Sequence, residues 1–200
     1  VHFLHAFAQR RSILVAILHP ANMRLTDELA GRRTRTMDNA TSMLDLHKSV
    51  GDLRGEFFVP AYQRGFRWSV DDVRRLLEDI EQALERREPE YTLQPVVVRK
   101  SGDRWELIDG QQRLTTLYLM FLVMRDRKLQ LADPPYALSY ERGLKWTDFK
   151  VDVLDRSEEH IDLHHLAAAY RCIDDWFAHW GDEYNQHRRA SPYCSYLRKV

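Results

Sequence analysis

The stretch Ile108-Asp109-Gly110-Gln111-Gln112-Arg113-Leu114-Thr115-Thr116 joins two segments with different hydrophobic patterns. Before it, Trp105 to Ile108 has the composition of a strand. After it, Leu114 to Met124 is apolar on nearly every face, which is typical of a helix buried inside a domain. Polar groups beside a buried helix need hydrogen-bonding partners. This strand-to-helix junction is therefore the first candidate for a functional site.

The flanking segments alternate between strand and helix patterns. Leu93 to Arg99 is rich in valine, and the turn Ser101-Gly102-Asp103 predicts a hairpin between it and the following strand. Ser69 is a good N-cap with Asp72 three residues on, as in a capping box, and apolar residues recur at helical spacing from Val70 to Leu84. The patterns also predict a short helix from Ser42 to Val50, a strand at Phe57 to Val59, a strand or loop at Tyr136 to Tyr140, a helix from Glu159 to Trp180 and a strand that begins at Tyr196. The predicted fold class is α+β.

The composition limits the number of domains, the partners and the location that can be expected for this protein. With 200 residues and 44% hydrophobic content, the chain can build the core of one ordinary domain. Thirty basic and thirty acidic residues cancel, so any site for a polyanion must be local. Two cysteines, Cys172 and Cys194, are too few for a disulfide framework and fit a cytoplasmic location. The apolar run Ile13 to Leu18 is far shorter than the about 20 residues that cross a membrane, so no membrane partner is expected.

The first 36 residues differ from the rest. They contain six arginines against two acidic residues and show no sustained periodicity. Two interpretations are open, a mis-assigned start or a basic, partly disordered arm that could touch phosphates. The expected organisation is an extension at 1–36, a core at 37–135 that holds the junction, and a helical continuation at 136–200 that belongs to a longer, truncated unit.

The junction has the outline of a phosphate site. The N-terminus of a helix offers free backbone N–H groups and a positive dipole end. Gly110 permits close approach of a ligand to the backbone, and Arg113 can form charge-assisted hydrogen bonds with phosphate oxygens. A plainer interpretation is equally open. Asp109 would then cap the helix, Gly110 would serve the turn, and Arg113 would pair with a nearby carboxylate.

A second polar segment, Tyr62-Gln63-Arg64-Gly65-Phe66-Arg67-Trp68, follows the strand that ends at Val59. Arginine can bind phosphate while an aromatic ring stacks on a base. Alternatively, the aromatic residues could anchor the loop on the core and leave the arginines solvated. A shared site requires Arg64 and Arg113, about fifty residues apart in sequence, to lie at one pocket.

Other chemistries have weaker support. His160 and His164 are four residues apart on a predicted helix, but no cysteine pair or HExxH pattern accompanies them, so no metal site is expected. Cys172 is interpreted as a small core residue. The chain has no GxxxxGK[ST] pattern, so any nucleotide is held differently from the way a P-loop enzyme holds it.

The order and spacing of Pro60, Tyr62-Gln63-Arg64, Trp68 and Asp109-Gly110-Gln111-Gln112-Arg113 resemble the N-terminal domain family of GmrSD restriction endonucleases. The resemblance covers roughly Met43 to Trp180. It implies a ParB- and sulfiredoxin-like mixed core with a following helical segment. Gly65 and Phe66 stand where relatives often have Pro and Tyr, which is expected to loosen the loop.

The resemblance also implies a function. The expected chain is a nucleotide-binding and nucleotide-hydrolysing domain of a cytoplasmic bacterial protein that restricts modified phage DNA. The expected cofactor is a nucleoside triphosphate, alone or with Mg²⁺. DNA would be reached through the full-length protein, with a C-terminal HNH-type domain or a partner subunit, since no nuclease motif is visible here. The candidate catalytic residue is Asp109, and the candidate nucleotide-binding residues are Gln63, Arg64, Arg67, Gly110, Gln111, Gln112, Arg113 and Thr115.

Two alternatives stay open. The same pocket could serve a non-catalytic, ParB-like nucleotide switch or a module that binds the DNA backbone. The chain could also be a structural fragment without independent activity, whose missing part completes the core.

Overall fold

A computed structural model describes residues 13–18, 47–89, 91–129, 133–141, 150–180 and 192–200. Six strands form one mixed sheet in the order β2-β1-β4-β5-β3-β6. The strands are β1 Ile13–Leu18, β2 His47–Lys48, β3 Glu56–Val59, β4 Val96–Ser101, β5 Arg104–Asp109 and β6 Ala137–Tyr140. The helices are α2 Val70–Glu85, α3 Gln111–Asp126 and α4 Ile161–Ala178, with a 3₁₀ turn at Val50–Asp52 and a π-helical turn at Lys150–Leu154. The predicted α+β class is confirmed.

The strand directions bring several chain segments to one edge of the sheet. β3 runs parallel to both β5 and β6, so these three strands end at the same edge. β4 runs antiparallel to β5 in the predicted hairpin, so its first residue lies at that edge too. The loop after β3, the junction after β5 and the segment before β4 are therefore neighbours in space.

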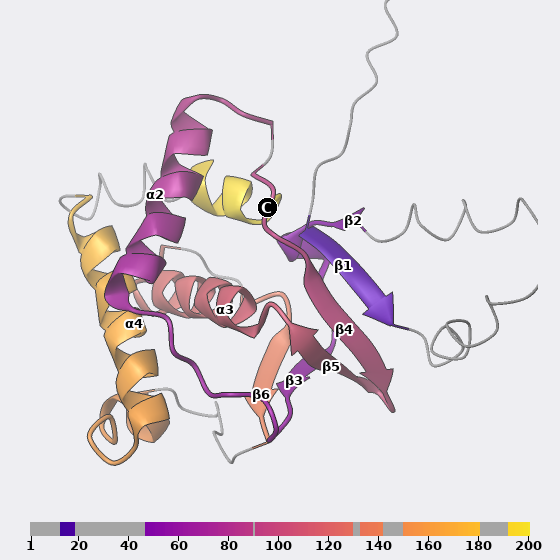
Figure 1. Ribbon diagram of the computed structural model, residues 1–200. Helices are drawn as coiled ribbons and strands as arrows, with labels where there is room; N and C mark the ends of the chain where they lie inside the picture. The colour runs from indigo at the N-terminus through magenta and orange to yellow at the C-terminus, as the bar shows by residue number, and fades with distance from the viewer. Residues whose placement is uncertain (1–12, 19–46, 90, 130–132, 142–149, 181–191) are drawn as a thin grey trace, which may run out of the picture.

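Helix α3 is the centre of the fold. In Figure 1 it lies between the sheet and α4. Every residue of α3 except Arg113, Arg125 and Asp126 is buried. This explains why its sequence is apolar around the whole circumference, because a helix packed on all sides has no solvent face to mark with polar residues. The predicted core helix is confirmed.

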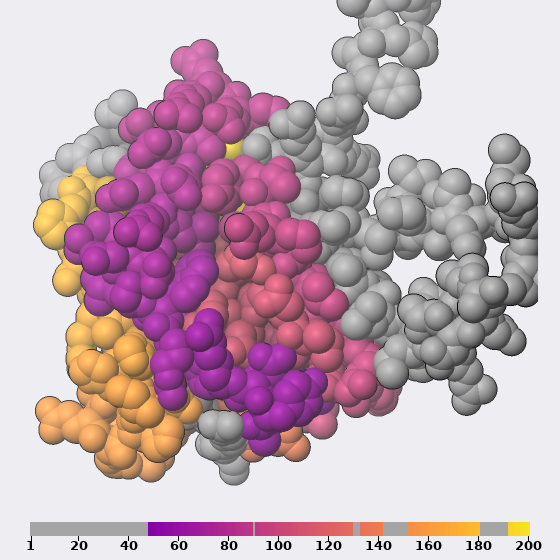
Figure 2. All heavy atoms as spheres, in the orientation of Figure 1, coloured from indigo at the N-terminus to yellow at the C-terminus, as the bar shows by residue number. Residues whose placement is uncertain are grey.

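Helix α2 has the opposite character. Its apolar residues form one buried stripe, and Ser69 and Asp72 close a reciprocal capping box at its start, as the sequence predicts. Figure 2 shows α2, in purple to magenta, at the surface beside α4 in orange. The predicted helix at Glu159 to Trp180 is also confirmed, as α4. Its N-cap is His160, whose ring accepts a hydrogen bond from the Asp162 N–H.

Two predicted elements are wrong. Instead of ending a helix, His47–Lys48 pairs with β1, and Val50–Asp52 forms a 3₁₀ turn, while residues 42–46 lie outside the described part. The end of the chain is not a strand, because residues 192–197 are helical. The two regions support each other, since the Val50 N–H donates to the Val200 carbonyl at 2.8 Å. Local patterns could not reveal a contact between segments so far apart in sequence.

The strand β1 comes from the segment that the sequence interpretation sets apart as an extension. It pairs with β2 on one side and runs parallel to β4 on the other. The rest of residues 1–36 lies outside the described part, and the division at 36/37 stays a prediction. None of the helices in the described part is long and apolar enough to cross a membrane.

Candidate functional site

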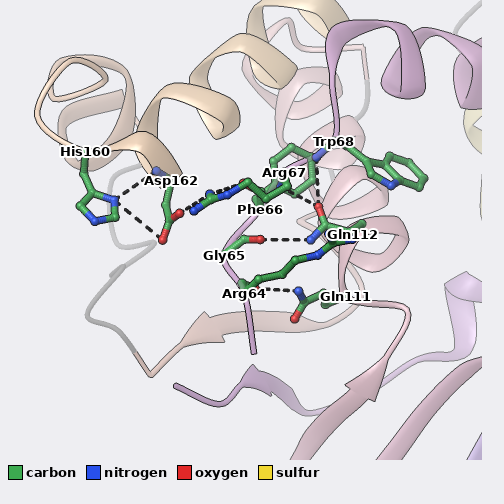
Figure 3. A network of polar contacts seen from close by, with 9 residues as sticks. All are labelled: Arg64, Gly65, Phe66, Arg67, Trp68, Gln111, Gln112, His160 and Asp162. Atoms are coloured by element: carbon green, nitrogen blue, oxygen red, sulfur yellow. Dashed lines mark hydrogen bonds and ion pairs between the residues drawn. The ribbon is translucent and has the colours of Figure 1, made fainter. Parts of the chain in front are cut away.

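The strand-to-helix junction and the loop after β3 meet at the shared edge of the sheet. Gln63 Nε2 donates to the Ile108 carbonyl at 2.7 Å, and Gln111 Nε2 donates to the Arg64 carbonyl at 2.7 Å. Figure 3 shows the loop lying against the start of α3, with Gln111 and Gln112 bonded to it. The convergence that a shared site requires is therefore present for the backbone of Arg64 and for the glutamines of both motifs.

Gln112 is the centre of this contact. Its Oε1 accepts hydrogen bonds from the backbone N–H groups of Arg67 and Trp68, at 2.8 and 3.2 Å. Its Nε2 donates to the Gly65 carbonyl at 3.1 Å. The residue is 8% exposed, so it supplies partners for three backbone groups that water reaches poorly. The Gln112 amide therefore braces the loop on the helix.

Gln111 differs from Gln112 in one respect. Its Nε2 is bonded to the loop, but its Oε1 is buried and has no hydrogen-bond partner. An unsatisfied buried acceptor costs free energy unless a donor reaches it. This oxygen is therefore a buried acceptor that no donor among the described residues reaches.

The far side of the loop is held by an ion pair. Arg67 Nη1 bonds to Asp162 Oδ1, and the Asp162 side chain is only 6% exposed. Gly65 lies against the same carboxylate, and a Cβ at this position would overlap the Asp162 side chain. Phe66 is fully buried. The loop is therefore closely packed at Gly65 and Phe66, and the loosening expected from these two replacements stays a prediction.

Arg113 projects to the other side of the junction. Its Nη1 donates to Gln94 Oε1 at 2.9 Å and its Nη2 to the Pro95 carbonyl at 2.8 Å. Asp109 lies 3.7 Å from Nη2 with a side chain that is 73% exposed. The plainer interpretation of Arg113 is therefore partly confirmed. Asp109 does not cap α3, however, because the N-cap is Gly110 and no side chain bonds there.

Gly110 gives the junction its shape. Its φ is +88°, in the left-handed region, and a Cβ would approach the Val96 Cγ2 to 2.8 Å. This close approach to β4 is possible only for glycine. The backbone N–H groups of Gln111, Gln112 and Arg113 then have no acceptor among the described residues, as expected for the first turn of a helix.

The two remaining predicted site residues lie in contrasting places. The Arg64 side chain is exposed, and its guanidinium forms no hydrogen bond or ion pair with another described residue. Thr115 is fully buried, and its hydroxyl lies 2.8 Å from the Tyr140 hydroxyl. Arg64 is thus accessible to a ligand at this edge, whereas the Thr115 hydroxyl is bonded inside the core.

A buried carboxylate that the sequence interpretation missed anchors the start of the loop. Glu106 accepts hydrogen bonds from the Tyr62 hydroxyl at 2.6 Å and from Arg99 Nη2 at 2.6 Å. Burial acts to raise the pKa of Glu106, but the hydrogen bonds from Arg99 and Tyr62 outweigh it and lower the pKa. The hydrogen bond to Glu106 in turn raises the pKa of Tyr62. A signal existed, since Glu106 is an isolated acid inside an apolar strand.

Asp162 and Glu141 were missed as well. Glu141 Oε2 accepts a hydrogen bond from the Ala61 N–H at 2.7 Å, so a third carboxylate holds the loop. No local pattern marks either residue, because each acts on a segment about 80 to 100 positions away. Among the described residues, no group of three or more His, Cys, Asp or Glu side chains could hold a metal ion. The pair His160 and His164 therefore has no further ligand there.

Comparison with known proteins adds one finding. The family model described as the N-terminal domain of GmrSD restriction endonuclease matches residues 43–194 of the chain. The match spans both the loop after β3 and the junction after β5. No curated protein and no solved structure matches the chain.

Proposed function

The chain belongs to the GmrSD restriction endonuclease N-terminal domain family and is part of a restriction-system protein, and we propose that it binds and hydrolyses a nucleoside triphosphate at the start of α3. The single observation that carries the proposal is the first turn of this helix. Three backbone N–H groups there have no acceptor among the described residues, at an edge where the loop after β3 places an exposed arginine. Such a helix end attracts phosphate.

The two arginines would act differently. Arg64 is free to bond phosphate oxygens directly, because no described residue occupies its guanidinium. Arg113 already bonds Gln94 and Pro95, so it would add positive charge and has fewer N–H groups left for phosphate than Arg64. Arg67 is committed to Asp162 and would act by holding the loop.

The glutamines would act mainly as positioning residues. Gln63 donates from the loop to the Ile108 carbonyl of β5, and Gln112 donates from α3 to the Gly65 carbonyl of the loop. Both bonds fix Arg64 relative to Gly110 without contact with the nucleotide. Gln111 would do the same through its Nε2. Its Oε1, which has no partner among the described residues, could accept a hydrogen bond from the ligand. Thr115 would support the helix from within the core.

Asp109 would be the catalytic residue. Its exposed carboxylate lies at the end of β5, directly before the phosphate-binding turn, and could orient an attacking water. A carboxylate oxygen is also a ligand that Mg²⁺ prefers, so a magnesium ion on the phosphates would fit beside Asp109 and neutralise their charge.

Calorimetric titration of the 200-residue chain with ATP, GTP, CTP and UTP tests the binding step. Replacing Arg113 by alanine should weaken binding by about 1.5–3 kcal/mol if it forms a charge-assisted bond. Arg64→Ala should weaken binding by a similar amount without lowering the melting temperature. Arg74→Ala, at the α2–α4 cleft, is the matched control and should bind as the wild type does. Equal affinities for all four proteins would remove both arginines from the site.

A second candidate is a nucleotide switch that does not hydrolyse its ligand. The observation in its favour is the 3.7 Å contact between Asp109 and Arg113, because a carboxylate that faces an arginine is less free to orient a water molecule. Phosphate release separates the two. If Asp109→Asn binds nucleotide as the wild type does but releases no phosphate, Asp109 is catalytic. If the wild type itself releases none, the switch is favoured.

Action on DNA is proposed for the whole protein rather than for this domain. The family to which the chain belongs is described as the N-terminal domain of a restriction endonuclease. We propose that an HNH-type domain or a partner subunit cleaves the DNA and that nucleotide turnover at α3 controls it. A longer protein that restricts DNA in the Asp109→Asn form as well as in the wild-type form would contradict this coupling.

A further inference from the structure

A pocket with a volume of about 270 Å³ lies between α2, the segment 91–94 and Arg113. It adjoins the first turn of α3 on the side away from Asp162. Trp68 and Arg113 both line it, so one residue of each sequence motif reaches this space. In Figure 3, Trp68 lies on the opposite side of Gln112 from Asp162.

The walls suit an uncharged, flat group. Trp68 and Tyr91 contribute aromatic surface and Leu76 contributes apolar surface. The charged lining residues are Asp72, Arg75, Asp79 and Arg113, whose formal charges cancel. A pocket without net charge is poorly suited to phosphates, whereas aromatic rings and guanidinium planes stack on nucleobases.

The aromatic walls are held in place. The backbone N–H of Trp68 donates to Gln112 Oε1 at 3.2 Å, and the Trp68 side chain packs partly buried against the core. The Tyr91 hydroxyl donates to Asp79 Oδ2 at 3.1 Å. Burial raises the pKa of Tyr91 to about 12, so this hydroxyl stays protonated and the bond persists near neutral pH. A ligand therefore meets a wall that does not need to be ordered on binding.

The size of the pocket decides how much of a nucleotide can enter. Sites for whole drug-sized ligands occupy about 300–1,000 Å³. At about 270 Å³, this pocket has room for a base and its sugar but not for a triphosphate as well. The phosphates would have to lie outside it, and the nearest anion-attracting feature is the start of α3, where Arg113 is the third residue.

We propose that this pocket binds the nucleoside part of the nucleotide whose phosphates lie at the start of α3. The inference rests on the proposed function, because it takes the nucleotide from there. It adds which part of the molecule confers recognition, namely the base and sugar between Trp68 and Tyr91.

Filling the pocket tests the inference. Thr92 is exposed and lines the pocket, so Thr92→Trp should block it without disturbing the core, and Thr92→Ser is the matched control. Calorimetric titrations would use ATP, GTP, CTP, UTP and inorganic tripolyphosphate. We expect Thr92→Trp to weaken the tightest nucleotide at least tenfold, to near the affinity of tripolyphosphate, and to leave tripolyphosphate binding unchanged. Tyr91→Leu should weaken the same nucleotide severalfold.

The failures of the two proposals are distinguishable. If tripolyphosphate and the nucleotides bind the wild type equally well and Thr92→Trp changes neither, the nucleoside pocket is wrong while the phosphate site stands. If neither tripolyphosphate nor any nucleotide binds, the phosphate site fails and the inference fails with it. A melting temperature of Thr92→Trp equal to that of Thr92→Ser shows that any loss is not due to unfolding.

Discussion

The two sides of the α3 N-terminus use similar residues in different ways. On the loop side, Gln112 bonds three backbone groups and leaves none of its own unsatisfied. On the other side, Arg113 bonds two oxygens of the segment before β4, while its buried Nε has no partner and open space lies beside it. The polar groups on the loop side therefore serve to hold the loop on α3, and we call this the framework side. The arginine side has groups and volume left for a ligand.

The motif Asp109 to Arg113 therefore has two roles: some of its residues hold the fold together, and others can contact a ligand. Its glutamines hold the loop, and its glycine and helix end form the turn. The N–H groups of the first turn of α3 have no acceptor among the described residues, and the Arg64 side chain is exposed beside them. Substitution of a residue that holds the fold should lower stability, whereas substitution of a ligand-binding residue should lower affinity and leave stability unchanged.

Gly110→Ala should have the largest effect, because both sides depend on this turn. A positive φ costs a non-glycine residue about 1–2 kcal/mol, and overpacking against Val96 adds about 1–3 kcal/mol, so we expect a loss of about 2–5 kcal/mol in the free energy of unfolding. Gly102→Ala is the control, since it has φ +59° but nothing within 4 Å. Urea denaturation measures both. Equal losses for the two variants would show that contact with Val96 is unimportant.

Gln112→Ala should follow, with a loss of about 2–4 kcal/mol. It leaves the Gly65 carbonyl and the N–H groups of Arg67 and Trp68 without their partner, and each buried unsatisfied group costs about 1–3 kcal/mol unless water replaces it. Gln94→Ala removes one exposed bond on the arginine side and should cost less than about 1 kcal/mol. Thermal unfolding that ranks Gln94→Ala at or above Gln112→Ala would contradict the division into framework and ligand sides.

Glu106→Gln should cost about 1–2 kcal/mol at pH 7 and change how stability depends on pH. The pKa of Glu106 in the folded state lies below its ordinary value of 4.5. Its stabilising effect is therefore fully present above about pH 4.5 and is lost as the pH falls through the lowered folded-state pKa. Unfolding measured from pH 7 down to pH 3 should show a smaller decline for Glu106→Gln than for the wild type. Parallel curves would exclude this carboxylate as a source of the acid sensitivity.

Arg64→Ala should have the smallest effect on stability, within about 0.5 kcal/mol of the wild type, because the side chain is exposed and bonds no described residue. Arg67→Ala is the comparison within the same loop, and it should be less stable because it leaves the buried Asp162 without its cation. Melting temperatures check both variants. If Arg64→Ala is destabilised, Arg64 stabilises the fold and is not a residue kept free for a ligand.

The residues that sequence reasoning placed correctly are those whose environment is local. The Ser69–Asp72 capping box, the turn at Ser101-Gly102-Asp103 and the apolar run of α3 depend on neighbours a few positions away. The strand-to-helix junction was found for the same reason, since periodicity changes there within three residues. The family was recognised from short motifs whose order along the chain is itself a sequence property, and the match at residues 43–194 confirms it.

The tertiary structure decided what each polar group does. Gln63, Gln111 and Gln112 have acceptors and donors about 45 positions away, and those partners come within reach only because β3 and β5 lie parallel in one register. Glu106 meets Tyr62 for the same reason. A hydrogen bond needs about 3 Å between two atoms, and no local pattern fixes such a distance across strands that are remote in sequence. Local patterns identified the two motifs, and the packing of the sheet on α3 fixed which of their polar groups form hydrogen bonds within the fold.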